Sequence, residues 1–160
     1  MLTRLLDALG VRKPARIEAG AALRPGRAVL FGTLQCETPV KSPVYGKPCA
    51  AFYYRASFRR ASRVKGFAQA LLRDALVYAD GLTLVLADGA TVTLAPRSNT
   101  DFGRADHQVL QQKGIDGFRA IEKRVPVGAR VAAHGVLRRA SGGWQLQLDQ
   151  LDREDGATEG

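Results

Sequence analysis

Residues 42–49 read SPVYGKPC and lead directly into residues 50–59, AAFYYRASFR. Two prolines and a glycine in so short a stretch predict a turn, because proline fixes φ and glycine accepts positive φ. The residues that follow alternate with a period of two, which is typical of a β-strand. One set, expected to face the core, is Ala50, Phe52, Tyr54, Ala56 and Phe58, and the other, expected to face solvent or a ligand, is Ala51, Tyr53, Arg55, Ser57 and Arg59.

The chain has the length and composition of one globular domain with short tails. Of its 160 residues, 46% are hydrophobic and 24% are charged, and both values are close to the averages for globular proteins. No apolar run comes near the roughly 18 residues that would suggest a membrane span. The first residues include Asp7 and lack an A-x-A cleavage site, so they do not read as a signal peptide. We therefore expect a cytoplasmic protein with no transmembrane span.

Residues 1–25 predict a short amphipathic helix followed by a connector. Leu2, Leu5, Leu6 and Leu9 recur at the spacing of one helical stripe. So short a helix needs a surface to lie on. That surface is the protein's own core or a sister subunit, a partner protein, or a membrane interface, which the nearby bases suit. The stripe is thus a candidate N-terminal interaction helix, able to hold the protein peripherally at a membrane.

Residues 26–150 predict one β-domain, and residues 151–160 an acidic tail that we expect to be disordered. The expected fold class is mainly β (α+β). It is a compact Greek-key or OB-like barrel, with one helical segment before the last two strands and a short N-terminal helix. A β-sandwich-like roll is the alternative. The elements behind this prediction are strands at 27–36, 129–137 and 144–148, helices at 106–113 and 117–124, and a stretch at 64–72 that reads as a short helix or a loop.

Two Asp-Gly pairs, Asp80-Gly81 and Asp88-Gly89, lie in the middle of the β-domain. Asp-Gly supplies the positive φ angles that type I′ hairpin turns need. These turns separate three short apolar runs at 75–79, 82–86 and 91–94. The spacing predicts a tight three-stranded meander.

The residues that carry chemistry are few. Cys36 and Cys49 form no CxxC motif, and the histidines are His107 and His134. A structural zinc site takes four such ligands at a recognisable spacing, so we expect no metal and no cofactor. We favour two reduced, packed cysteines over a disulfide. Ser42 and Cys49 have no histidine near them in sequence to activate a nucleophile, so we expect no enzyme.

The net charge of +9 is spread unevenly, since residues 141–160 hold one base and five acids. A basic body favours polyanions such as single-stranded nucleic acid, an anionic membrane surface or an acidic protein, although such charge also serves solubility alone. Bases cluster where the alternating strand ends, and aromatic side chains among bases are what single-strand binders use. A solvated strand face is the alternative. The candidate binding residues are Tyr53, Arg55, Arg59, Arg60 and Arg63, with Lys65 nearby.

The turn and its strand resemble the GIDE-type domain of membrane-bound E3 ubiquitin ligases in mitochondria and chloroplasts, and of bacterial relatives. That domain has a Gly-containing first strand, a Ser-Pro turn, and then a Gly and a Cys before an aromatic-Arg strand. An Asp-Gly turn, a valine-bearing strand, a Glu and two further Gly follow. Over about residues 26–150 the matching positions are Gly32, Ser42, Pro43, Gly46, Cys49, Tyr53, Tyr54, Arg55, Asp88, Gly89, Thr91, Val92, Glu122, Gly128 and Gly135.

The resemblance implies a role in recognising or organising a partner protein near a membrane. The ligases flank this domain with membrane helices and end in a RING zinc finger, and this sequence shows neither, so ligase activity is not implied. We therefore expect a non-enzymatic protein-interaction or scaffolding module with an unidentified protein partner. An OB-like nucleic-acid-binding domain that uses the basic aromatic strand face is the alternative.

Overall fold

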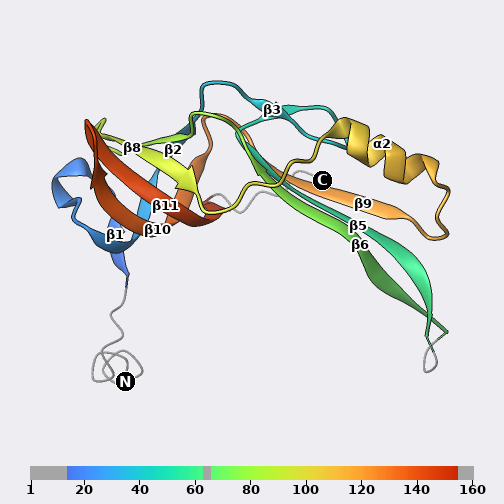
Figure 1. The fold of residues 1–160 in the computed structure, drawn as a ribbon. Coiled ribbons are helices and arrows are strands. Elements are labelled where there is room, and N and C mark those ends of the chain that lie inside the picture. The colour runs from blue at the N-terminus through green and yellow to red at the C-terminus, as the bar shows by residue number, and fades with distance from the viewer. Residues whose placement is uncertain (1–13, 63–65, 155–160) are drawn as a thin grey trace, which may run out of the picture. The chain divides into compact units, whose positions relative to one another are not determined.

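The computed structural model describes residues 14–62 and 66–154 (Figure 1). The candidate helix with Leu2, Leu5, Leu6 and Leu9, and the candidate residue Arg63, lie outside this range. The described residues fall into two compact units that alternate along the chain. We call residues 14–33, 83–97 and 130–154 the barrel unit, and residues 34–62, 66–82 and 98–129 the sheet unit. The sequence had suggested one continuous β-domain over residues 26–150.

The barrel unit is built around a closed barrel of five strands (Figure 1). The order around the barrel is β2(Gly26–Gln35), β10(Arg130–Ala140), β11(Gly143–Arg153), β8(Thr91–Pro96) and β7(Thr83–Val85), and β7 pairs back with β2. β10 runs antiparallel to β2 and to β11, β7 runs antiparallel to β8, and β8 and β11 run parallel. The barrel core includes Leu30, Leu84, Val92, Val131, Leu137, Leu146 and Leu148. The predicted mainly β class with a barrel is confirmed.

The segment before β2 adds two short elements to the barrel unit. β1(Ala15–Ile17) pairs parallel with β2, and the 3₁₀ turn η1(Gly20–Ala22) follows it. Asp88 in the β7–β8 hairpin accepts hydrogen bonds from the amides of Gly20 and Ala90, at 2.7 and 3.1 Å. The predicted connector is therefore partly strand.

The sheet unit is a three-stranded antiparallel sheet in the order β6(Gly66–Tyr78), β5(Ala51–Ser62), β9(Arg119–Val125). A short ladder of β3(Val40–Lys41) and β4(Pro48–Cys49) and the helix α2(Arg104–Gln112) complete it (Figure 1). One face of the sheet is covered, because the side chains of Phe52, Tyr54, Ala56, Ala75 and Val77 pack there with Cys49 and Phe102, and with Leu110 of α2. The predicted helix before the last two barrel strands is α2.

Two predictions about elements were wrong. Residues 117–124 are mostly strand β9 rather than helix, and residues 66–72 belong to β6. A bulge lies between β5 and β6, where Ala56 opposes Arg73 but Ser57 opposes Leu71. The extra residue breaks the alternation of apolar side chains that would have marked a strand.

The predicted meander is also wrong, because residues 75–78 end strand β6, which pairs with β5, and of the three predicted strands β7 and β8 alone are paired with each other in the described structure. Residues 151–153, which the prediction assigned to the acidic tail, belong to β11, and residues 155–160 lie outside the described range. In the part of the chain that the structure describes, no helix is long and apolar enough to cross a membrane.

Gly32 of β2 lies where two strands approach closely. A Cβ on Gly32 would overlap the carbonyl oxygen of Val85 at the seam between β2 and β7. The bulge of the barrel lies between His134 and Gly135 of β10. Glycine at these two positions lets neighbouring backbones approach closely.

Candidate functional site

The segment that holds the sequence motif is a closed turn in the sheet unit. The amide of Ser42 donates to the carbonyl of Lys47 at 2.8 Å, and the amide of Gly46 donates to the carbonyl of Ser42 at 2.9 Å. The hydroxyl of Ser42 accepts from the amide of Lys47 at 3.0 Å. Gly46 has φ of +66°, which a side chain would oppose. Ser42 and Gly46 therefore act as turn residues.

The two cysteines are free, and Cys49 is fully buried after the turn. Burial raises the pKa of Cys49 to about 11 and also raises the pKa of Cys36. Both groups are therefore thiols near neutral pH, and a buried thiol packs as a small apolar side chain.

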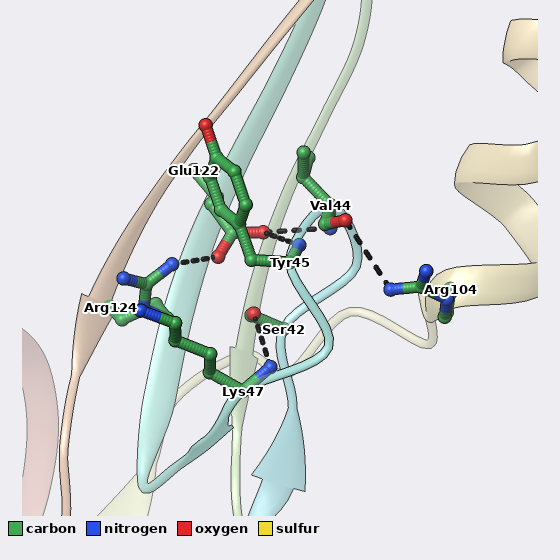
Figure 2. A network of polar contacts seen from close by, with 7 residues as sticks. All are labelled: Ser42, Val44, Tyr45, Lys47, Arg104, Glu122 and Arg124. Carbon is green, nitrogen blue, oxygen red and sulfur yellow. Dashed lines mark hydrogen bonds and ion pairs between the residues drawn. The ribbon is translucent and has the colours of Figure 1, made fainter. Parts of the chain in front are cut away.

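A buried carboxylate fastens the turn to β9, as Figure 2 shows. Glu122 Oε1 accepts hydrogen bonds from the amides of Val44 at 2.7 Å and Tyr45 at 3.2 Å. Its Oε2 pairs with Arg124 Nη1, and the side chains of Glu122 and Arg124 are only 0% and 3% exposed. Arg104 of α2 donates to the carbonyl of Val44 at 3.3 Å. The turn is thus held at its amides by Glu122 and at a carbonyl by α2.

Glu122 remains ionised inside this network. Burial alone would raise its pKa, but hydrogen bonds from Ser42, Arg124 and the two turn amides outweigh burial and hold the pKa of Glu122 below its usual value. The guanidinium of Arg124 also lies 5.4 Å from the centre of the Tyr45 ring. The sequence pointed to Glu122 through the family resemblance, but it did not indicate that Arg124 is its buried partner.

His107 lies in the covered side of the sheet unit, near the start of α2. It is 6% exposed, and its Nδ1 shares a hydrogen bond of 2.8 Å with the hydroxyl of Tyr54. Phe102 stacks on Tyr54 with ring centres 4.5 Å apart. Burial lowers the pKa of His107, Arg104 lowers it further, and Glu122 acts in the opposite direction.

We expect the stability of the sheet unit to fall as the pH is lowered through about 6.5. Because the folded-state pKa of His107 lies below the unfolded value of 6.5, the unfolded chain takes up a proton first. The contribution of neutral His107 to stability is fully present above pH 6.5. As the pH falls toward the folded-state pKa, this contribution decreases by at most about 1.4 kcal/mol per pH unit. Urea unfolding one pH unit above and one below 6.5 measures the loss. A His107→Gln variant keeps a hydrogen-bond partner for Tyr54 and should lose little stability over the same pH range. An equal loss of stability in the variant would show that another group causes the pH dependence.

Among the described residues of the sheet unit, no element covers the opposite face of the three-stranded sheet. From β5 it carries the side chains of Tyr53, Arg55, Ser57 and Arg59, which alternate with the buried residues. By register, β6 and β9 add their own outward residues to it. We call this surface the open face: Tyr53, Arg55, Ser57, Arg59, Gln69, Leu71, Asp74, Leu76, Arg119, Ile121 and Lys123.

The open face combines exposed aliphatic side chains with positive charge. Leu71 is 51% and Ile121 is 41% exposed. As far as the described residues define it, the open face carries four bases and one acid. A shallow hollow of about 290 Å³ lies on it, lined by Arg55, Ser57, Gln69, Ala70, Arg119 and Ile121.

The structure brings only part of the predicted binding set together. Tyr53, Arg55 and Arg59 share the open face, whereas Arg60 alternates with Arg59 and points to the other side. Their strand, β5, belongs to the sheet unit, so these residues do not lie on the barrel, where the OB-like alternative had placed them. The sequence analysis did not place Leu71, Ile121, Arg119 and Lys123 on this face, because it did not indicate that β6 and β9 pair with β5.

The second histidine, His134, lies on the barrel surface, where its Nε2 is 3.1 Å from a carboxylate oxygen of Asp152. Among the described residues, no three His, Cys, Asp or Glu side chains are placed to hold a metal ion together.

No protein-family model matches the chain, and no curated protein matches its sequence. The GIDE-type resemblance therefore rests on the matching residues alone, of which Ser42, Gly46, Cys49 and Glu122 meet in the turn and the core beside it.

Proposed function

We propose that this chain is a non-enzymatic, GIDE-like interaction module that binds an acidic protein partner on the open face of the sheet unit. The observation that carries the proposal is the exposure of Leu71 and Ile121 among Arg55, Arg59, Arg119 and Lys123. Aliphatic side chains on an uncovered sheet face gain from burial against a partner, and arginine is enriched at such interfaces. The positive charge selects a partner of opposite sign.

The buried network supports the proposal by fixing the strand that forms part of the surface. Glu122 and Arg124 point into the covered side, so Ile121 and Lys123, which alternate with them on β9, point to the open face. The bonds from Glu122 to the turn and to Arg124 hold β9 in place before a partner arrives. A surface ordered in advance loses less entropy on binding. The motif residues of the turn thus have a role in supporting the surface.

Phage display tests the proposal. A random peptide library is selected for binding to the immobilised full chain. We expect enriched peptides that combine Asp or Glu with aliphatic residues. Their binding to Ile121→Asp should be weaker by about tenfold or more, since a charge then replaces the exposed aliphatic side chain. Val109→Asp is the matched control, because Val109 is 54% exposed but lies on α2. Selection of peptides without acids, or equal binding to Ile121→Asp, would refute the proposal.

Single-stranded nucleic acid is the second candidate ligand, and one observation favours it. Tyr53 opposes Lys123 on the open face and lies beside Arg55 on the same strand face. A base stacked on the ring would bring its phosphates near these cations. Fluorescence anisotropy of labelled single-stranded DNA and RNA over a salt series decides the question. The nucleic-acid function is favoured if the double variant Arg55→Ala/Arg59→Ala loses binding. The double variant Arg24→Ala/Arg60→Ala has the same net charge and should then keep binding.

The proposal places the protein in the cytoplasm, with peripheral membrane contact through Leu2, Leu5, Leu6 and Leu9 as a second attachment. Those residues lie outside the described part of the chain. Co-sedimentation with anionic vesicles, compared between the full chain and a chain lacking residues 1–13, tests this attachment. Equal sedimentation of the two would exclude it.

A further inference from the structure

We infer that the hollow on the open face is a site for one carboxylate of the partner, held between Arg55 and Arg119, with an aliphatic side chain on each side of it. This inference rests on the proposed function and specifies its ligand. The occupant is a partner segment in which an Asp or Glu lies between two aliphatic residues.

The register of the sheet places the two arginines on one diagonal. Arg55 of β5 opposes Ile121 of β9, and Ser57 of β5 opposes Arg119 of β9. Diagonal neighbours on one sheet face have backbones about 7–8 Å apart, which is within reach of two long side chains that share a ligand. Both arginines and Ser57 line the same hollow. A group in the hollow can therefore contact both guanidinium groups and the hydroxyl.

No acidic side chain of the described residues lines the hollow, although Asp74 of β6 opposes Arg55 of β5 beside it. In the described part of the chain, neither Arg55 nor Arg119 forms an ion pair. Guanidinium groups bind carboxylates through paired N–H donors, and such charge-assisted bonds are stronger than neutral ones. The hydroxyl of Ser57 and the side-chain amide of Gln69 offer further donors. A carboxylate fits this set of donors.

The aliphatic side chains lie on both sides of the donors. Ser57 pairs with Leu71 of β6 on one side and with Arg119 of β9 on the other, and Ile121 is the next outward residue of β9. Ile121 in turn opposes Arg55 of β5, so a diagonal across the sheet runs from Leu71 through Ser57 and Arg55 to Ile121. A segment with the order aliphatic, acid, aliphatic would cover Leu71 and Ile121 while its carboxylate enters the hollow.

A double-mutant cycle with a selected peptide and the full chain tests the inference. We expect Arg119→Ala to weaken binding about tenfold, and Arg119→Lys to restore it only in part, because lysine cannot form the paired bonds. Replacing the acid of the peptide by its amide should cost about as much. The two changes together should cost little more than either alone. Arg60→Ala removes the same charge from the other side of β5 and should leave affinity within about twofold.

The outcomes separate the inference from the proposed function. Additive effects of Arg119→Ala and the amide peptide would overturn the carboxylate site, while the proposed function stands if Ile121→Asp still abolishes binding. If Ile121→Asp has no effect either, both fail. A peptide with phosphoserine in place of the acidic residue tests whether the hollow binds a phosphate rather than a carboxylate. Tenfold tighter binding of that peptide, with no coupling between Arg119 and the acid, would reassign the hollow to a phosphate and overturn the inference.

Discussion

Replacing Glu122 with Gln is expected to destabilise the sheet unit by about 3–5 kcal/mol. The substitution keeps the shape of the side chain but removes its charge. Arg124, whose side chain is 3% exposed, then remains buried without its counter-ion. The amides of Val44 and Tyr45 lose a charged acceptor for a neutral one. Since both effects act on the same turn, the turn and β9 should loosen together.

Urea unfolding with tyrosine fluorescence measures this loss, because all four tyrosines lie in the sheet unit, whereas the single tryptophan, Trp144, lies in the barrel unit. Glu154→Gln, followed by the fluorescence of Trp144, is the control, since Glu154 pairs with Arg130 at the surface of the barrel unit and its loss should cost less than about 1 kcal/mol. Adding Arg124→Met to Glu122→Gln should recover part of the stability, because the uncompensated charge is removed. A loss no larger than that of the control would show that Glu122 does not anchor the turn.

The same residues explain why the turn could be located from the sequence but its anchor could not. Proline and glycine act locally, so residues 42–49 alone indicated a turn, and the alternation of β5 indicated which side chains are buried. On β9 the core-facing residues include Glu122 and Arg124, which interrupt the apolar pattern. Their burial is possible only because each neutralises the other and because distant turn amides supply donors. No local signal carries that information.

The two-unit organisation was hidden for a related reason. β2 pairs with β10, and Thr33 opposes Arg130, so the barrel is closed by strands from nearly opposite ends of the chain. Periodicity predicts strands but says little about which strands pair over such separations. Tyr53, Arg55 and Arg59 of the predicted binding set do share one face of β5, as the alternation indicated, but whether they bind a ligand stays a prediction. The predicted set lacked Leu71, Ile121 and Arg119, which only the pairing of β6 and β9 with β5 adds.

Gly135→Ala is expected to destabilise the barrel unit by about 3 kcal/mol, at the upper end of the cost of overpacking. A Cβ at this position would overlap the carbonyl oxygen of Gln147 and lie 2.9 Å from its carbonyl carbon and 3.2 Å from Leu146 Cγ. A side-chain neighbour could rotate away, but the carbonyl belongs to β11, and moving it would disturb the ladder between β10 and β11.

Gly143→Ala is the matched control, because a Cβ at Gly143, in the same pair of strands, meets nothing within 4 Å. Its unfolding midpoint, followed by the fluorescence of Trp144, should stay near that of the wild type, whereas the midpoint of Gly135→Ala should fall. If both variants unfold like the wild type, the close approach of β10 and β11 at Gly135 is not as tight as described. If only Gly135→Ala is destabilised, the requirement for glycine at this position comes from the backbone of the neighbouring strand. Gly135 would then match the family pattern for a structural reason, independent of any ligand on the open face.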